Sequence, residues 1–194
     1  KKGYSGVAIF SKKKPDQIVH GNGHSMSDDE GRVIRVDFGD LSIINCYFPS
    51  GTSGDIRQTY KYQWLEEFTI YIEKLKKTRQ KLVVTGDYNI AHKEIDIHDP
   101  KGNKKSSGFL PEERAWMDTF MSLGWIDSFR FKNPEKTGSY SWWSQRFPSV
   151  RLQNKGWRID YLCTTQIMEK RIVSASILPL VKHSDHCPIV LEIK

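Results

Sequence analysis

Short apolar stretches of strand length, separated by two amphipathic helices, are the feature that most constrains how this chain can fold. Such stretches lie at residues 6–10, 33–38, 41–47, 81–85, 157–164, 172–178 and 188–193. Residues 64–75 and 111–123 instead carry apolar side chains at helical spacing. Because the strands mix with helices, in hairpins as well as crossovers, the pattern predicts an α/β fold, a layered sandwich of two mixed β-sheets flanked by helices.

Local turn and helix-end residues support these boundaries. Gly39 separates two strand-like stretches by a tight connection, which predicts an antiparallel pair. Pro111 stands in the first turn of the second helix and Gly124 follows its last turn, so this helix has the clearest ends in the sequence. Residues 92–108 are polar and lysine-rich and predict a long surface loop, a kind of segment that usually carries function.

The start of the chain is unusual. It opens without an initiator methionine and almost directly on the apolar stretch 6–10, which predicts a buried strand. A domain rarely begins inside its own core. We therefore expect one domain over residues 1–194 that lacks its first strands, because they were removed or are naturally absent.

Composition restricts the environment of the chain. The 194 residues, 38% of them apolar, suffice for one domain with a core, and no stretch approaches the ~20 apolar residues of a membrane span. Signal-peptide features are absent from the sequence, which predicts an intracellular protein that does not bind membranes. Three cysteines, at positions 46, 163 and 187, lie far apart without CxxC spacing, so we expect reduced thiols rather than a zinc site.

The charge balance favours polyanionic partners without proving one. Thirty Lys and Arg residues stand against 23 Asp and Glu residues, a net charge of +7. The basic excess gathers at residues 12–14, 74–81, 101–105 and 146–158. Solvated surface is an equally good explanation for such runs, so the charge alone decides nothing.

Three polar clusters occur where predicted strands end or pass. They are residues 86–89 after one strand, 158–160 inside another, and 183–186 just before the last. Strand ends are where α/β proteins hold their active sites. Each cluster also has a structural explanation: a turn capped by Asp87 and Asn89, an ion pair of Asp160 with Arg158, and a loop braced by Asp185 and His186.

Together the clusters contain what phosphodiester hydrolysis requires. That reaction needs an activated water, neutralised phosphate oxygens and a stabilised leaving group, usually with a divalent metal ion. His186 is the best candidate for contact with the phosphate. An aspartate partner, for which Asp160 is available, would fix its tautomer and raise its pKa.

Long ordered segments of the sequence look like one known family. GDYNIAHKEIDIHDPKGNKKSSGFLPEER, GWRIDYL and HSDHCPIVLEI, with GYSGVAIFSKKKP and INCYFPSGTSGDIRQTYKYQWLEEF upstream, resemble the exonuclease III and apurinic/apyrimidinic endonuclease family, within the endonuclease/exonuclease/phosphatase superfamily. The likeness covers essentially the whole chain. SDH by itself is shared with deoxyribonuclease I, sphingomyelinases and inositol polyphosphate phosphatases, whereas GDYNIAHKEID with the KGNKKSSGF loop is far more specific to the DNA-repair branch.

The resemblance implies a deoxyribonuclease I-like fold, here N-terminally incomplete, and a DNA-repair hydrolase. It would cleave the backbone of double-stranded DNA 5′ to abasic sites, with 3′-phosphodiesterase and 3′-exonuclease activity as side reactions. Mg²⁺, or else Mn²⁺, would be the cofactor. We expect a monomer, cytoplasmic and nucleoid-associated in a bacterium or nuclear in a eukaryote.

Roles in catalysis carry over from the family to matching positions. Asp87 would orient or deprotonate the attacking water, and Asn89 would bind the scissile phosphate. His186, paired with Asp160, would contact the phosphate, and Tyr47 would offer its hydroxyl to the phosphate or the leaving group. For Tyr47, packing in the core is the alternative.

The resemblance also implies metal and DNA contacts. The metal ligands would be Asp185, Asp87 and Asn89, with the principal ligand, a Glu, expected upstream of this chain. Trp142 and Trp157 resemble the aromatic wall that receives the abasic sugar, whereas Trp143 fits plain core packing. Contacts to the duplex backbone are expected from the long loop, through Lys101, Asn103, Lys104 and Lys105.

The sequence departs from the family in two places. The strand that ends in an Asn-rich turn and the strand that carries the metal-binding Glu are not in this chain, so we expect it to be poorly active alone. Ser50 also stands where many relatives have Asn. Two other readings stay open: a catalytically impaired DNA-binding fragment of the same fold, and a phosphatase or phosphodiesterase of the same superfamily acting on a lipid or inositol phosphate.

Overall fold

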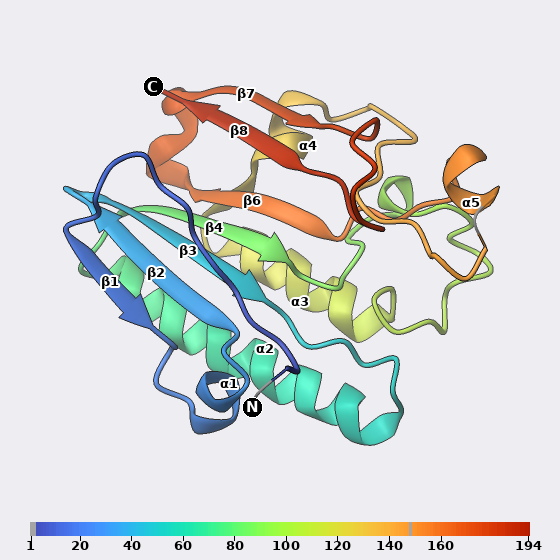
Figure 1. Ribbon diagram of the computed structural model, residues 1–194, viewed down its shortest axis with the longest axis horizontal. Coiled ribbons are helices and arrows are strands. Elements are labelled where there is room, and N and C mark those ends of the chain that lie inside the picture. The colour runs from blue at the N-terminus through green and yellow to red at the C-terminus, as the bar shows by residue number, and fades with distance from the viewer. Residues whose placement is uncertain (1–2, 148) are drawn as a thin grey trace.

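Two β-sheets form the framework of the computed structural model, which describes residues 3–147 and 149–194 (Figure 1). The larger sheet has six strands in the order β1-β2-β3-β4-β6-β5, and the smaller one pairs β7 with β8. The strands are β1 (Gln17–His20), β2 (Val33–Phe38), β3 (Leu41–Tyr47), β4 (Lys81–Asp87), β5 (Trp125–Asp127), β6 (Asp160–Thr165), β7 (Ile172–Ile177) and β8 (Ile189–Ile193).

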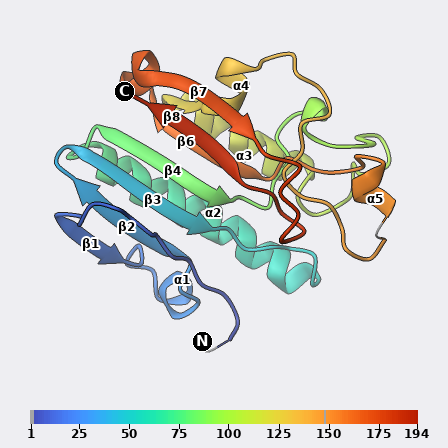
Figure 2. The same cartoon turned by 45° about the horizontal axis from the view of Figure 1, so that its top comes forward.

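Helices cover one side of the larger sheet. The long helices α2 and α3 lie on the side away from β7 and β8, which face the sheet near β6 (Figures 1 and 2). The helices are α1 (Ser25–Asp29), α2 (Asp55–Lys76), α3 (Pro111–Ser122), α4 (Ser128–Lys132) and α5 (Ser149–Leu152), with 3₁₀ turns η1 (Glu94–Asp96) and η2 (Gln166–Arg171). This arrangement confirms the predicted layered α/β sandwich of two sheets flanked by helices.

Strand pairing brings distant polar residues into one row. β2 and β3 form the predicted hairpin through Gly39, and β3 continues through α2 into β4, which lies parallel to it. In the register of the sheet, Tyr47 is opposite Asp87, and Asp87 is opposite Asp160 on the antiparallel β6. Three side chains far apart in the sequence therefore lie in one row across neighbouring strands, at the same end of those strands.

An aromatic core fixes the helix layer against this sheet. Phe48 stacks on Tyr88 with ring centroids 4.2 Å apart, and Trp64 of α2 stacks on Phe68 at 5.0 Å. Aromatic rings supply large buried apolar areas, so this cluster holds the turns after β3 and β4 rigidly. The helices in residues 3–147 and 149–194 include none with the length and apolarity needed to cross a bilayer.

Residues 6–10 do not form the buried strand that the sequence predicts. They join neither sheet, and the Phe10 side chain is 97% exposed. The segment crosses the face of the large sheet in front of β3 and β4 (Figure 1), where the neighbouring strands already pair with each other. Its carbonyl at Ala8 instead accepts a hydrogen bond from Asn45 Nδ2 at 2.9 Å.

The strand predicted at residues 157–164 starts later than expected. β6 begins at Asp160, so Arg158 precedes the strand rather than lying inside it. Trp157 forms only isolated bridges, with Ile97 and with Trp142. The backbone bond from Arg158 N–H to the Asp96 carbonyl, at 2.8 Å, turns this segment toward the loop and away from the sheet.

Candidate active site

Asp87, Asp160 and His186 form the centre of the site. Asp87 is the last residue of β4 and Asp160 the first of β6, opposite each other in the sheet. His186, three residues before β8, places its Nδ1 atom 2.9 Å from Asp160 Oδ2 and 3.2 Å from Oδ1. This contact fixes the orientation of the ring, and His186 lines the cavity described below.

Burial and the charges within this centre shift the pKa values of its acidic and basic side chains. Burial would lower the pKa of His186, but the hydrogen bond and charge of Asp160, with the charges of Asp87 and Asp185, raise it to about 9. Burial and then the charge of Asp160 raise the pKa of Asp87, against the opposing effects of His186, Asn89 and Lys61, to about 7. Near neutral pH the histidine is therefore cationic, and the carboxyl of Asp87 exchanges protons readily.

The turn after β4 aims Asp87 and Asn89 into the same space. Asn89 has a left-handed φ of 52°, and its backbone N–H donates to Asp87 Oδ1 at 2.8 Å. Its side-chain Nδ2 donates to Asp87 Oδ2 at 3.1 Å and to the Phe48 carbonyl at 3.0 Å. The turn capping considered as an alternative is therefore present. It also orients the Asp87 carboxylate, so the structural and the catalytic readings coexist.

Asp185 is held beside this centre by an aromatic side chain. Trp142 Nε1 donates to its Oδ2 at 3.0 Å, and Ser184 Oγ to its Oδ1 at 2.9 Å. Although burial raises its pKa, these two hydrogen bonds and the charge of His186 lower it overall. Asp185 is therefore an ionised carboxylate next to the cationic histidine.

Tyr47 lies opposite Asp87 and lines the cavity, so it is not simply a core aromatic. Burial and then the charge of Asp87 raise the pKa of its hydroxyl, which stays protonated and can donate a hydrogen bond. Arg32 holds the residue from behind: its guanidinium lies 4.9 Å from the ring centroid and donates to the Tyr47 carbonyl at 2.9 Å.

One cavity of about 930 Å³ collects most of the predicted site residues, but Asp160 does not line it. Trp142 and Trp157 form part of its wall, with rings 6.1 Å apart and nearly perpendicular. Of the predicted site residues, the cavity is lined by Tyr47, Asp87, Asn89, Lys105, Trp142, Trp157, Asp185 and His186. Trp143 is only 2% exposed, which confirms the core role expected for it.

The other DNA contacts predicted in the lysine-rich loop of residues 92–108, called the basic loop, do not line this cavity. Lys101 and Lys104 are exposed on the loop surface. Asn103 is engaged within the loop, because its Nδ2 donates to the carbonyls of Asp99 at 2.9 Å and His98 at 3.2 Å. Its expected contact with DNA would require those bonds to be exchanged.

Two residues that hold the centre in place were missed in the sequence. Ser141, fully buried, accepts hydrogen bonds through its Oγ from the backbone N–H groups of Ile159 and Asp160, both at 3.1 Å. Arg32, described above, supports Tyr47. A lone serine or arginine outside a motif carries no sequence signal of such a role.

The ion pair considered between Asp160 and Arg158 is wrong. Arg158, 1% exposed, donates from Nε to Asp96 Oδ1 at 2.8 Å and from Nη2 to Asp127 Oδ2 at 2.6 Å. Asp96 and Asp127 therefore satisfy the Arg158 guanidinium, and no ion pair joins it to Asp160, whose partner is His186.

Residues 1–186 match the endonuclease/exonuclease/phosphatase family. The chain belongs to this family. Exodeoxyribonuclease of Bacillus subtilis is 42% identical over 193 residues, which are all of this chain and 76% of that protein. DNA repair nuclease APEX1 of Danio rerio is 38% identical over 191 residues, 98% of this chain and 61% of that protein.

Solved structures of this family agree with the fold. The 3′ phosphatase NExo from Neisseria, bound to product DNA hairpin, superposes with a TM-score of 0.88 at 26% identity, over 95% of this chain and 73% of that one. An AP endonuclease from Archaeoglobus fulgidus gives 0.86 at 28% identity, over 94% and 72%. The chain spans about three-fifths to three-quarters of the relatives named here, and the exonuclease III-type resemblance is confirmed.

Members of this family generally depend on a divalent metal ion. The oxygen ligands predicted here, from Asp87, Asn89 and Asp185, line one cavity and suit Mg²⁺ chemically. Nevertheless, within residues 3–147 and 149–194 no cluster of three or more His, Cys, Asp and Glu side chains could hold a metal ion. Metal binding by Asp87, Asn89 and Asp185 therefore stays a prediction.

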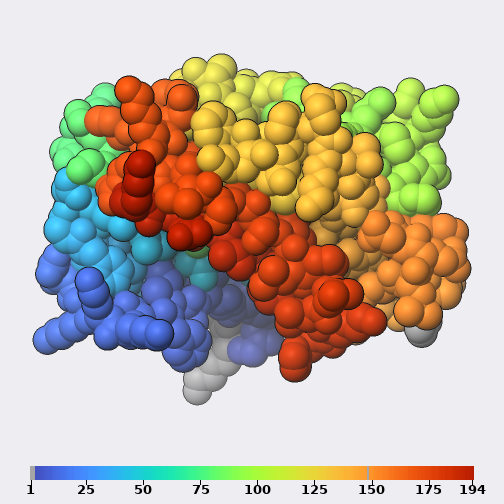
Figure 3. Space-filling model, turned by 90° about the horizontal axis from the view of Figure 1, so that it is seen from above, coloured from blue at the N-terminus to red at the C-terminus, as the bar shows by residue number. Residues whose placement is uncertain are grey.

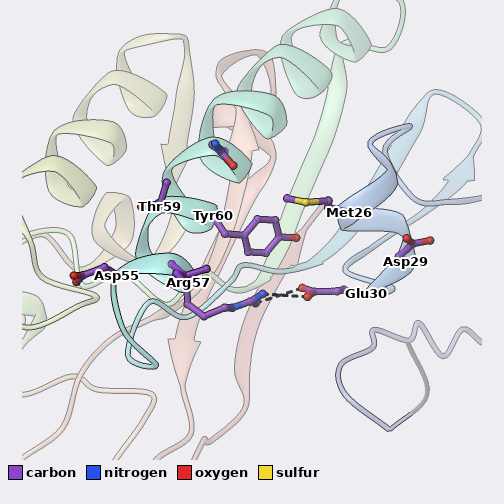
Figure 4. Close-up of a pocket in the computed structure, with 9 residues that line it drawn as sticks. Met26, Asp29, Glu30, Asp55, Arg57, Thr59 and Tyr60 are labelled. Atoms are coloured by element: carbon purple, nitrogen blue, oxygen red, sulfur yellow. Dashed lines mark hydrogen bonds and ion pairs between the residues drawn. The ribbon is translucent and has the colours of Figure 1, made fainter.

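Two further openings lie near the family site. One, of about 450 Å³, reaches Asp87 and His186 from the side of residues 6–8, and Figure 3 shows this hollow between the N-terminal (blue) and C-terminal (red) residues. The other, of about 810 Å³, lies between α1 and the first turns of α2 (Figure 4). Its lining holds three carboxylates, and its arginine, Arg57, points at Glu30 (3.1 Å), so it does not suit a phosphate.

Proposed function

We propose that this chain is a DNA-repair phosphodiesterase that hydrolyses the DNA backbone 5′ to abasic sites. One observation carries the proposal: Asp87 and Asp160 face each other on adjacent strands, His186 pairs with Asp160, and Asp87 and His186 line a cavity with two tryptophans in its wall. Relatives named exodeoxyribonuclease and DNA repair nuclease support the DNA-repair assignment over a lipid or inositol phosphatase.

The chemistry follows from the side chains. The Asp87 carboxylate takes a proton from a water molecule, whose oxygen attacks the phosphorus in line with the leaving oxygen. Protonated His186 donates from Nε2 to a non-bridging oxygen, and the Asn89 side chain binds the same phosphate. The Tyr47 hydroxyl donates to the phosphate or the departing oxygen. Each contact strengthens as negative charge develops in the transition state.

The surroundings of the cavity suit damaged DNA. An abasic site lacks a base, so its sugar can leave the helix and pack against Trp142 and Trp157. Lys101, Lys104 and Lys105 would contact phosphates of the duplex, with Asn103 beside them, and would position it without reading its sequence. A phosphate at a 3′ end fits the same cavity, in line with the relative named 3′ phosphatase, so 3′-end trimming is a side activity of the same site.

A divalent ion, Mg²⁺ or Mn²⁺, would neutralise phosphate charge when bound beside Asp185, with Asp87 and Asn89 as further oxygen ligands. We propose that the protein works as a monomer on chromosomal DNA, in the bacterial nucleoid or the eukaryotic nucleus. The ion's protein ligands and the assembly state are open to titration calorimetry and sedimentation.

The decisive experiment measures incision of a duplex that carries a tetrahydrofuran abasic analogue, in Mg²⁺. The unmodified chain, which we expect to be poorly active alone, should cut weakly 5′ to the analogue and leave the undamaged duplex intact. In Asp87→Asn and His186→Asn, kcat should fall by at least about a hundredfold, because a general base or a charged donor is lost. The dissociation constant for the same duplex in EDTA should change much less.

The outcomes separate the open readings. Binding of the abasic duplex without any incision would favour the reading as a catalytically impaired fragment. The incomplete set of metal ligands among the described residues supports that reading. Hydrolysis of an inositol phosphate in preference to the duplex would overturn the DNA-repair proposal.

A further inference from the structure

A fully buried ion pair lies next to the turn after β4 that carries Asp87 and Asn89, called here the catalytic turn. Lys61 of α2 and Glu113 of α3 are both 0% exposed, and Lys61 Nζ lies 2.5 Å from Glu113 Oε1. Lysine and glutamate are almost never fully buried unless paired. No step of the chemistry above uses either residue.

Lys61 also contacts the catalytic turn itself. Its Nζ donates to the Asn89 carbonyl at 2.8 Å. Asn89 has a left-handed backbone, and its side chain and N–H both hold the Asp87 carboxylate. A charged donor on the Asn89 carbonyl therefore fixes the orientation of the peptide that aims Asp87 and Asn89 into the cavity.

Glu113 holds the end of the basic loop. Its Oε2 accepts hydrogen bonds from the backbone N–H groups of Gly108 at 2.6 Å and Leu110 at 3.0 Å. Gln58 strengthens the connection, donating to Glu113 Oε1 at 3.1 Å and accepting from Ser107 Oγ at 2.7 Å. The segment held in this way directly follows the lysines of residues 101–105.

The catalytic turn and the end of the basic loop also contact each other directly. The Ala91 N–H donates to the Gly108 carbonyl at 2.8 Å, and a methyl group built on Gly108 would lie 3.0 Å from the Asn89 carbonyl. One unbroken chain of contacts therefore runs from Ser107 and Gly108 through Glu113 and Lys61 to Asn89. Replacing a buried ion pair with hydrophobic residues of similar size often leaves stability unchanged or increases it. The contribution of this pair to stability therefore does not explain its presence.

We propose that Lys61 and Glu113 are positioning residues that lock the DNA-binding loop and the catalytic turn into one rigid unit. Phosphates bound by the loop then lie at a set distance from Asp87 and Asn89, and the scissile phosphate arrives in register with them. Displacements of about 1 Å at such sites can cost about a hundredfold in rate. This inference rests on the proposed function for its kinetic consequence, but the rigid unit itself does not depend on catalysis.

The kinetic test uses the paired substitution Lys61→Met with Glu113→Gln, which leaves no unpaired charge in the core. Incision of the tetrahydrofuran duplex should lose about tenfold or more in kcat, because the Asn89 carbonyl loses its donor. Lys61→Arg keeps a charged donor and should therefore retain most of the kcat of the unmodified chain. The matched control is Ile72→Ala, a fully buried change about three turns further along the same helix.

Ile72→Ala should lower the melting temperature and leave kcat at 25 °C unchanged. If the paired variant keeps the kcat of the unmodified chain, or if Ile72→Ala loses as much, the pair is only structural and the proposal fails.

A second measurement needs no catalysis. Amide hydrogen exchange at Gly108 and Ala91 should speed up about tenfold or more in the paired variant, relative to amides of the sheet, and should stay unchanged in Ile72→Ala. Unchanged exchange at both amides in the paired variant would overturn the proposal even if the chain incises DNA. Absence of incision by the unmodified chain with the expected exchange pattern would instead count against the proposed function alone.

Discussion

Single side chains set the pH range in which this site can work. In the proposed mechanism Asp87 must be ionised to take a proton from water, and its pKa is raised to about 7, chiefly by burial and by Asp160. His186 must be protonated to donate to the phosphate, and its pKa of about 9 results from Asp160 outweighing the effect of burial. We expect kcat/KM to rise with pH through about 7 and to fall through about 9, measured by incision at constant ionic strength.

Asp160→Asn is the informative variant for this profile. Without the aspartate charge, the pKa of His186 falls, so the descending limb of the profile should move to lower pH. The ascending limb should move the same way, because the charge of Asp160 also raises the pKa of Asp87. His24→Gln, far from the cavity on the approach to α1, is the control and should leave both limbs in place. If Asp160→Asn left both limbs of the profile in place, the assignment of these limbs to Asp87 and His186 would be refuted.

At the scale of elements, the end of β4 depends on one glycine. Gly86 has a φ of 134°, and a methyl group added there would lie 1.8 Å from the Cys46 carbonyl oxygen on β3. Gly86→Ala should therefore lower the free energy of unfolding by about 3 kcal/mol or more, measured by urea denaturation. Gly39→Ala is matched in having a left-handed φ, 57°, but has open space around it. It should lose only about 1 kcal/mol, and equal losses would show that crowding at β3 is unimportant.

The basic loop should act through charge alone. Lys104→Ala should weaken binding of abasic duplexes uniformly across sequences and lower the slope of log K against log salt by about one unit, because one phosphate contact is lost. Fluorescence anisotropy over a salt series measures this. Lys77→Ala, an exposed lysine just beyond α2, is the control and should leave the slope unchanged. A sequence-dependent loss would argue for base contacts instead.

At the scale of the whole molecule, Arg158 ties three segments together. Buried between Asp96 of η1 and Asp127 of β5, it joins the long loop and the sheet to the segment before β6. Arg158→Met would leave two buried carboxylates without this partner, so it should cost about 3 to 5 kcal/mol at neutral pH.

This cost should depend on pH in a defined direction. Burial raises the pKa of Asp96, but Arg158 and Arg130 outweigh it and lower that pKa overall. The stabilisation is thus complete above the unfolded pKa of about 4 and is lost as pH falls through the lower folded value. The stability gap between Arg158→Met and the unmodified chain should therefore narrow on going from about pH 7 to about pH 3 in urea titrations. A gap independent of pH would contradict this account.

The sequence by itself determined the parts of this protein that depend on neighbouring residues. Helix ends at Pro111 and Gly124, the hairpin at Gly39 and the strand before Asp87 all follow from local turn chemistry and side-chain periodicity, which act over a few residues. The family and its candidate site residues were also readable, because the motifs that carry them are continuous in the chain.

Only the tertiary structure decided which distant groups meet. Asp160 pairs with His186 rather than with Arg158, Asp87 faces Asp160 across 73 positions of sequence, and Lys61 reaches Asn89 and Glu113. Residues 6–10 read as a strand but form none, because an apolar stretch becomes a strand only where a partner leaves backbone groups unpaired. Register, burial and competition among partners are properties of the assembled fold, and no local pattern encodes them.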